Sequence, residues 1–348
     1  MELLDKSHPV LVTGGSGYIA SWLCKYLMEE GYHVRATFRD RENIAKYEHL
    51  QTIQDHTPGT LEIWEADLLD PTSFENVMEG CQVVFHVASP FIIFGAKDPE
   101  NTLVKPAVEG TRTVLEAATR SRTVRRVVLT SSVVAMLGDN KDLQSYPNHT
   151  VTKDSWNTTS TLAHQPYNYS KTLAEREAWR FAEGQSWDLV VMNPGMVLGP
   201  SLSQRTDGAS VDFMLRMLSG KFSVGVPDNH LGMVDVRDVA KGHILAAKNP
   251  QAKGRYILVG HHTNFLEIAQ TLAQKYPKAP LPKRLVPKWL FSMVGPMYGA
   301  SRKYVRQNIG YPVAFDAKPS QIELGLAYRP LAETLYDMAD QLAADELW

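Results

Sequence analysis

Two side chains that could exchange a proton with a substrate, Tyr167 and Lys171, stand four residues apart, and good helix formers follow from Lys171 onward. Residues four apart lie on one face of a helix with their Cβ atoms ~5–6 Å apart. A cationic lysine beside a phenol favours the phenolate, so this spacing predicts a tyrosine pKa below its ordinary value of ~10. Such a tyrosine could act as a proton donor or acceptor near neutral pH. An amphipathic helix with a solvated lysine has the same spacing, so the pair needs support from other motifs.

A glycine-rich turn between an apolar run and an apolar helix is the second motif. Gly14 and Gly17 let the backbone turn sharply and approach a pyrophosphate, and Ala20 is small enough for close packing of helix and strand. The following helix would offer free N–H groups to the phosphate. Because a strand precedes the turn and a helix follows it, a dinucleotide-binding loop is favoured over a simple tight turn.

A strand that ends in hydroxyl groups is the third motif. The expected strand of residues 126–130, with the apolar run 127–129, leads into Ser131 and Ser132. Ligands of open α/β sheets bind outside the carboxyl ends of the strands, where a serine could donate a hydrogen bond to a carbonyl oxygen. The alternative is a serine-containing turn that only caps the strand.

The composition is that of an ordinary globular protein. The 348 residues are 44% hydrophobic and 21% charged, which suffices for a large core and two lobes. The formal net charge is -2, so we expect neither nucleic acid nor a membrane as a partner. Without a signal peptide or a membrane-spanning run, and with only Cys24 and Cys81, the chain is expected to be cytoplasmic. It has no Cys-x-x-Cys pattern, and no metal is expected.

Apolar runs alternate with helical segments, which predicts an α/β fold with a Rossmann-type, doubly wound parallel sheet. Right-handed crossovers would bring the glycine turn, Ser132 and Tyr167 to one edge of that sheet. Strands are expected at residues 10–13, 33–38, 61–65, 83–86, 126–130, 189–193 and 255–259, and helices near 19–30, 72–79, 102–120, 167–183, 211–218 and 233–248.

The pattern changes after residue 195, where a polar, loop-like stretch begins, and again after residue 260, where prolines and short helices follow. We therefore expect a dinucleotide-binding domain of residues 1–195 and 233–260. A smaller, mostly C-terminal substrate lobe of residues 196–232 and 261–348 would close over the cofactor edge.

With the three motifs together, the chain resembles the extended short-chain dehydrogenase/reductases. Within them it is most similar to the dihydroflavonol reductase-like group, which includes cinnamoyl-CoA reductases and microbial aldehyde and ketone reductases. The resemblance is dense from residue 10 to residue 200 and fades in the tail. It rests on segments that occur in the family's order, namely residues 13–20, 34–40, 86–90, 98–101, 105–111 and 167–179.

The resemblance implies NADP(H) as the cofactor and a role for each matching residue. NADPH would deliver hydride to the carbonyl carbon of a small substrate, Ser132 and Tyr167 would hydrogen-bond its oxygen, Tyr167 would donate the proton, and Lys171 would bind the nicotinamide ribose. Arg39, with Lys46 as a second cation, would meet the adenosine 2′-phosphate; the alternative is a surface arginine paired with Asp40. The other implied cofactor contacts are Gly14, Gly17, Tyr18, Ile19, Asp67, Leu68, Val87, Ala88, Ser89 and Pro194.

Two departures from the family bear on the substrate. Dihydroflavonol reductases carry an asparagine where this chain has Leu137, and cinnamoyl-CoA reductases carry Asn-Trp where it has Gln165 and Pro166. An aldehyde or ketone in an apolar pocket is then the expected substrate. Candidate lining residues, each of which could equally be ordinary core, are Phe91, Phe94, Met136, Leu137, Met196, Phe213 and Met217.

Two other functions remain open. An epimerase or dehydratase that acts on a nucleotide sugar with bound NAD would use the same fold, although Arg39 argues against it. A regulator that senses NADP without turnover would not need Tyr167 and Lys171, and both are present. The helices at 102–120 and 167–183 could form a homodimer contact, but a monomer is equally compatible with the sequence.

Overall fold

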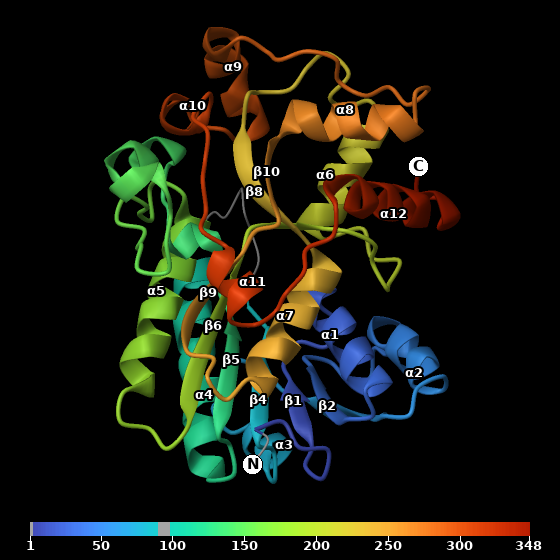
Figure 1. The fold of residues 1–348 in the computed structure, drawn as a ribbon, viewed down its shortest axis with the longest axis vertical. Coiled ribbons are helices and arrows are strands. Elements are labelled where there is room, and N and C mark those ends of the chain that lie inside the picture. Colours follow the sequence, from blue (N-terminus) through green and yellow to red (C-terminus); the bar gives the residue numbers. More distant parts are fainter. Residues whose placement is uncertain (1–2, 90–97) are drawn as a thin grey trace.

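A seven-stranded parallel sheet lies at the centre of the protein (Figure 1), whose computed structural model describes residues 3–89 and 98–348. The strand order is β3-β2-β1-β4-β5-β6-β9, so the direction of winding reverses between β1 and β4. Ligands of open α/β sheets bind at such a switch point. The strands are Val10–Val12 (β1), His33–Phe38 (β2), Thr60–Glu65 (β3), Val83–His86 (β4), Arg126–Thr130 (β5), Asp188–Pro194 (β6) and Gly254–Leu258 (β9).

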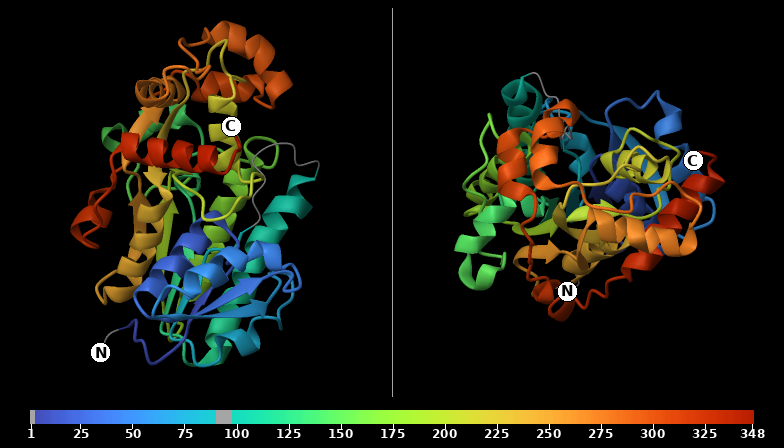
Figure 2. Two further views of the ribbon diagram at one scale, coloured as in Figure 1. Left: turned by 90° about the vertical axis from the view of Figure 1, so that its right-hand side faces the viewer. Right: turned by 90° about the horizontal axis from the view of Figure 1, so that it is seen from above.

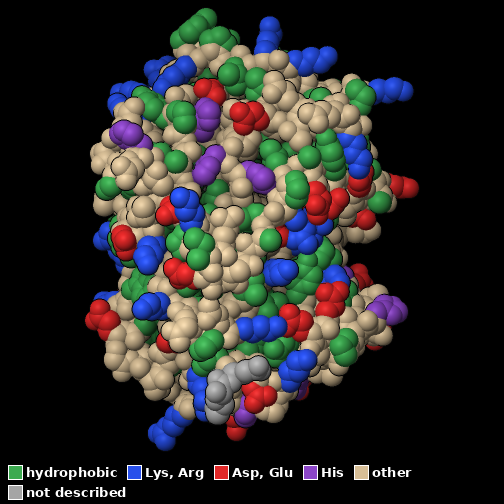
Figure 3. Space-filling view, viewed as in Figure 1, with side chains coloured by type: hydrophobic (Ala, Val, Ile, Leu, Met, Phe, Trp, Pro, Cys, Tyr) green, Lys and Arg blue, Asp and Glu red, His purple; other side chains and the backbone are tan. Residues whose placement is uncertain are grey.

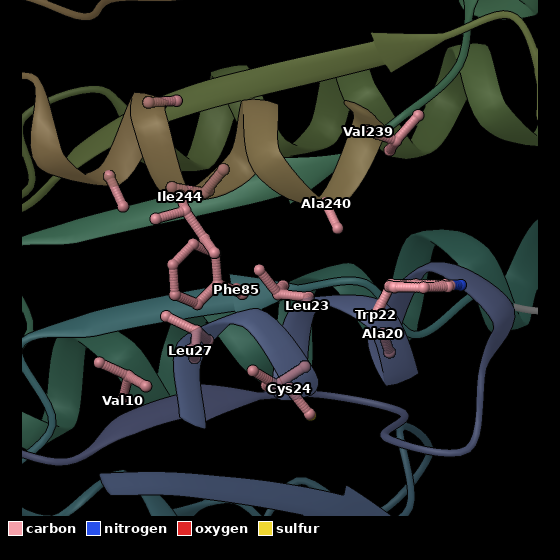
Figure 4. Close-up of a cluster of buried hydrophobic side chains, with 14 of the residues drawn as sticks. Val10, Ala20, Trp22, Leu23, Cys24, Leu27, Phe85, Val239, Ala240 and Ile244 are labelled. Atoms are coloured by element: carbon pink, nitrogen blue, oxygen red, sulfur yellow. The ribbon is translucent and has the colours of Figure 1, made fainter. Parts of the chain in front are cut away.

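Helices cover both faces of this sheet, and the central strands β1, β4 and β5 are buried at every position. Strands buried on both faces are mostly apolar, and polar residues occur here only at the ends of β4 and β5. The helices α1 (Tyr18–Glu29), α2 (Glu48–Gln54) and α7 (Val236–Lys248) contribute to the core on one face. Figure 4 shows Leu23 and Leu27 of α1 in one apolar cluster with Ala240 and Ile244 of α7.

The opposite face carries α3 (Glu75–Met78), α4 (Lys105–Ser121) and α5 (Pro166–Ala182). The last two run side by side, and Val114, Leu115 and Ala178 pack from them onto the sheet. A short π-helical turn, Glu100–Val104, leads into α4. This face therefore places the Tyr167 helix directly beside the helix that follows β4.

A smaller sheet forms the second lobe, in the upper half of Figure 1 and in both views of Figure 2. Its strands are Met196–Leu198 (β7), His230–Asp235 (β8) and His261–Asn264 (β10), with β8 in the middle. A separate apolar core joins it to α6 (Ala209–Leu218), α8 (Phe265–Lys275) and α12 (Leu331–Ala344). At the far end lie α9 (Lys288–Val294), the 3₁₀ turn η6 (Gly295–Tyr298) and α10 (Arg302–Asn308), and α11 (Lys318–Ile322) returns to β9.

The predicted fold class is confirmed, and the predicted strands agree with the observed ones to within one residue at each end. The helix predicted to start at Met233 was wrong at its beginning, because residues 230–235 pair with β7 and β10 as a strand. Asp235 then caps α7 by accepting from the Arg237 N–H at 2.8 Å. Leu324 and Leu326, from the tail assigned to the second lobe, pack into the core of the first, and the division into domains stays a prediction.

Candidate active site

The glycine turn after β1 packs so tightly against Ala88 and Phe38 that side chains at Gly14 and Gly15 would not fit. Gly14 has a φ of +70°, and a Cβ there would lie 3.0 Å from the Ala88 Cβ. A Cβ on Gly15, which the sequence interpretation did not single out, would lie 2.7 Å from the Phe38 ring. The Gly17 N–H donates to the Gly14 carbonyl at 2.8 Å, and Gly17 is the N-cap of α1. The turn thus leads directly into the N-terminus of α1, whose first backbone N–H groups are suited to a pyrophosphate.

Thr13 joins the ends of β1 and β4 at the switch point. Its buried Oγ1 accepts from the N–H groups of Val87 at 3.1 Å and Ala88 at 3.0 Å, and lies 3.0 Å from Nδ1 of His86. Burial, and secondarily the charge of Lys171, lowers the pKa of His86 to about 3, so this imidazole is neutral. These bonds hold Val87 and Ala88 against the glycine turn.

Tyr167 and Lys171 lie on one face of α5, with the lysine Nζ 5.9 Å from the centroid of the phenol ring. The predicted lowering of the Tyr167 pKa was wrong: burial raises it, because the phenolate would lose its hydration. Burial also lowers the pKa of Lys171 to about 8, and the Glu175 carboxylate opposes this shift. At neutral pH Tyr167 therefore holds its proton, which is the form that a proton donor needs.

The turn that presents Tyr167 is fixed by the side chain of Gln165. This residue precedes α5 in a left-handed conformation, with a φ of 56°. Its Nε2 donates to the Gly138 carbonyl at 3.1 Å and to Asp139 Oδ1 at 2.6 Å, and its Oε1 accepts from Asn168 at 2.6 Å. Asp139 also lies 2.9 Å from Nε2 of His164. Gln165, which the sequence showed only as a departure from relatives, thus anchors the start of the helix.

Ser131 and Ser132 have different partners at the end of β5. The Ser131 hydroxyl donates to Glu175 Oε2 at 2.5 Å, so it is directed into the core. The Ser132 hydroxyl makes long contacts, donating to the Pro194 carbonyl at 3.4 Å and accepting from the Val134 N–H at 3.3 Å. Long bonds are exchanged at little cost, so Ser132 rather than Ser131 is suited to bind a substrate oxygen.

Glu175 is a buried carboxylate that links four parts of the site, and the sequence interpretation did not include it. Besides Ser131, it accepts from Asn193 Nδ2 at 2.8 Å and from Trp179 Nε1 at 3.2 Å. Arg255 Nε lies 2.6 Å from its Oε1, an ion pair whose N–H direction is not aligned for a hydrogen bond. Asn193 in turn donates to the Ser132 carbonyl at 3.1 Å.

A small pocket shows that the separate segments meet at the carboxyl edge of the sheet. The glycine turn touches Ala88, and the pocket joins the segment after β4 to the end of β5 and to Lys171 of α5. The sequence-predicted residues that it brings together are Ala88, Ser89 and Lys171, and its other lining residues are His86, Thr111, Leu129, Thr130, Ser131, Ala174 and Glu175.

The implied adenosine end is open and cationic. The Arg39 side chain is 80% exposed, and its Nε lies 3.9 Å from Asp67 Oδ2, whereas Asp40 accepts from the Glu42 N–H. Lys46 ends the 3₁₀ turn Ile44–Lys46 after β2. Leu68 lies against Gly110 of α4: a Cβ added to Gly110 would come within 2.9 Å of the Leu68 Cβ.

The loop after β7 contributes a further cation that the sequence interpretation treated only as part of a polar loop. Arg205 Nη1 donates to the Ser16 carbonyl of the glycine turn at 3.3 Å. The loop is held there by α1, since the Tyr18 hydroxyl donates to the Gly199 carbonyl and Trp22 Nε1 donates to the Pro200 carbonyl at 2.8 Å. Ile19, in the same first turn of α1, is half-buried against the core.

The candidate substrate residues are scattered. Met136 is fully buried and Leu137 nearly so, in a cluster with Val259 and Phe315. Met196 is half-buried on β7, and Phe213 and Met217 belong to the core of the second lobe. Phe91 and Phe94 lie outside the described residues.

Comparison with known proteins gives relatives over nearly the whole chain. The chain is 35% identical over 345 residues to the cinnamoyl-CoA reductase CAD2 of Medicago truncatula, an alignment that covers 98% of both. It is 37% identical over 292 residues to an anthocyanidin reductase ((2S)-flavan-3-ol-forming) of Vitis vinifera, covering 79% of this chain and 84% of that one. The crystal structure of yeast methylglyoxal/isovaleraldehyde reductase Gre2 complexed with NADPH matches with a TM-score of 0.79 and 26% identity, covering 98% and 100%.

The family model described as the NAD dependent epimerase/dehydratase family matches residues 10–260. This range contains the glycine turn, Ser132, Tyr167 and Lys171, and the predicted resemblance is thereby confirmed. The chain belongs to the NAD dependent epimerase/dehydratase family, that is, to the extended short-chain dehydrogenase/reductases, and is similar there to the dihydroflavonol reductase-like enzymes.

Proposed function

We propose that this protein reduces an aldehyde or ketone to an alcohol with NADPH. The observation that carries this proposal is the meeting of the glycine turn, the end of β5 and the Tyr167–Lys171 face of α5 at one edge of the sheet. The names of the relatives support it, since they are reductases of cinnamoyl-CoA, of anthocyanidin and of methylglyoxal or isovaleraldehyde.

The residues present fit an NADP cofactor. A Cβ would fill the cradle at Gly14 and Gly15, which is expected where backbone must approach a pyrophosphate. Arg39, just past β2, is exposed and only loosely paired, so it is available to a 2′-phosphate. Arg205 and, more weakly, Lys46 lower the pKa of Asp207, so these two cations lie near each other and would supply further positive charge to the cofactor phosphates. Val87, Ala88, Ser89 and Pro194 would flank the nicotinamide ribose and carboxamide.

The side chains of this site would then act on the substrate oxygen. The bound cofactor supplies the hydride for the carbonyl carbon. Ser132 and Tyr167 hydrogen-bond the oxygen as negative charge develops on it, and Tyr167 donates its phenolic proton there. Lys171 holds the ribose and stabilises the phenolate that remains.

An epimerase or dehydratase remains the second candidate, because the family description names those activities. NAD that copurifies with the protein, together with turnover of a nucleotide sugar, would favour it.

The packing of α4 beside α5 on one outer face of the sheet would also allow a homodimer built from four helices.

The test is an NADPH-oxidation assay over a panel of aldehydes, ketones and diketones. We expect turnover with NADPH well above that with NADH, and a decrease of about 10²–10⁴-fold in kcat for Tyr167→Phe, the usual contribution of a positioned acid. Tyr169→Phe, two residues further along α5, is the matched control and should keep its activity. Equal rates with both cofactors would remove the case for Arg39, and an active Tyr167→Phe would overturn the mechanism.

A further inference from the structure

One stretch of the second lobe carries only one sign of charge. Residues 277–315 contain seven basic residues and no Asp or Glu, although the whole chain has a net charge of -2. All seven are exposed, and none of them forms an ion pair with a described carboxylate. The net charge of the whole chain does not reveal this basic segment, so the composition alone did not predict an anionic partner. The basic residues are Lys278, Lys283, Arg284, Lys288, Arg302, Lys303 and Arg306.

The same stretch displays large apolar side chains. Of the twelve exposed large hydrophobic residues among residues 3–89 and 98–348, six lie here, although the stretch is about a ninth of the chain. Trp289 is 67% exposed, Met293 65%, Met297 84% and Tyr298 76%. Exposed apolar side chains gathered in this way indicate a binding surface, whereas single ones are normal.

The apolar side chains are held outward by packing beneath them. Trp289, Met293 and Met297 are spaced by four residues along α9 and η6, so they follow one face. Phe291, on another side, packs on a small cluster of Ala300, Val305 and Ile309. The Lys288 amino group donates to the Ile309 carbonyl at 2.7 Å and fixes the start of α9 on α10.

We propose that this surface, the basic tip (residues 283–306), docks onto an anionic lipid surface. In Figure 3 apolar side chains stand at the upper end of the molecule, where Figure 1 places α9, and Lys and Arg side chains lie around them. Cations attract anionic headgroups, and Trp, Tyr and Met enter the boundary between headgroups and acyl chains. A second copy of the chain would bring cations against cations. In the described part of the chain no helix could cross a bilayer, so the contact is peripheral.

Cosedimentation with vesicles tests the proposal directly and needs no enzymatic activity. We expect the protein to sediment with vesicles of phosphatidylcholine and phosphatidylserine, but not with phosphatidylcholine alone, and to be released by high salt. The double variant Arg302→Glu, Lys303→Glu should lower the partition constant by about tenfold or more, since each cation near such a surface contributes ~1 kcal/mol. Trp289→Ala with Met297→Ser should lower it even at low salt.

Matched controls carry the same changes elsewhere on the surface. Ile322→Ser removes an exposed apolar side chain from α11, and Lys241→Glu reverses a charge on α7; both should bind vesicles like the wild type. Turnover of a water-soluble aldehyde without vesicles should be unchanged in all of these variants. Two results would overturn the proposal. The first is no vesicle binding by the wild type, as expected if the tip binds an acidic protein. The second is a raised KM in the double variant with Trp289→Ala and Met297→Ser, which would make the tip a wall of the substrate pocket.

Discussion

At the scale of single residues, the protonation state of the site depends on Glu175. Burial drives both Tyr167 and Lys171 toward their neutral forms, and the Glu175 carboxylate, one helical turn from Lys171, is the group that opposes this for the lysine. Buried and paired with Arg255, Glu175 keeps its position through bonds to Ser131 and Asn193. It is a positioning residue, since it acts on substrate only through its neighbours.

Removing that charge should change the pH dependence of the reaction. In the wild type, the alkaline limb of kcat/KM should lie near the Lys171 pKa of about 8, because kcat/KM reports the groups of the free enzyme. Glu175 raises that pKa, so Glu175→Gln should move the limb to lower pH and reduce the rate at pH 8 by about tenfold. The measurement is a pH profile of NADPH oxidation with a good substrate from the panel.

A purely structural role for Glu175 is separable from this electrostatic one. Glu175→Gln leaves Arg255 buried without its partner, which should cost about 3–5 kcal/mol of stability. The double variant Glu175→Gln, Arg255→Gln should recover much of that stability and keep the shifted profile. Glu177→Gln, on the same helix and also in an ion pair, should leave the profile in place. An unshifted limb in Glu175→Gln would refute the role.

At the scale of elements, the loop after β7 is tied to the glycine turn. α1 holds its start through Tyr18 and Trp22, and Arg205 reaches the Ser16 carbonyl. Arg205 also pairs with Asp207 at 2.8 Å. The second lobe therefore places a cation at the glycine turn, where we propose that the pyrophosphate binds, whereas Arg39 after β2 lies at the proposed adenosine end.

These two arginines should have distinguishable effects on cofactor binding. A cation at the pyrophosphate acts on both cofactors, so Arg205→Ala should raise the KM for NADPH and for NADH about equally, by roughly tenfold. Arg39→Ala should raise the KM for NADPH alone. Arg216→Ala, which breaks a comparable surface ion pair on α6, is the control. If Arg205→Ala affects only NADPH, Arg205 belongs to the 2′-phosphate instead.

Local patterns account for the parts of this molecule that could be predicted. The strands of the seven-stranded sheet, the glycine turn and the Tyr167–Lys171 spacing are each encoded within a few consecutive residues. The partners of Thr13, Glu175 and Arg205 come from distant segments, and no local pattern announces them. The last three residues of β8 were predicted as helix because the pairing of this strand with β7 and β10 is also non-local. The raised Tyr167 pKa depends on burial, which spacing does not report.

At the scale of the whole molecule, two buried histidines should make the fold sensitive to acid. His86 joins β4 to β1, and His243 joins α7 to β5 through Val239 and Thr130, at 2.8 and 2.7 Å. Burial lowers their pKa values from 6.5 to about 3 and about 4. The folded chain thus keeps both neutral in a range where the unfolded chain protonates them, so their stabilising effect is complete above pH 6.5 and is lost as pH falls toward 4.

The expected size of this loss follows from the proton count. Two extra protons bound by the unfolded chain lower the free energy of unfolding by about 2 kcal/mol between pH 6 and pH 5, since one pKa unit corresponds to ~1.4 kcal/mol. Urea unfolding at a series of pH values measures the slope, to which carboxylates also contribute. His243→Gln should therefore be compared with the wild type: the variant is less stable at pH 7, but its slope is smaller by about one proton, and His86→Gln should behave alike. Parallel slopes in wild type and both variants would show that these imidazoles take up protons without unfolding, and that the ends of β1, β4 and β5 are not held together by neutral histidines.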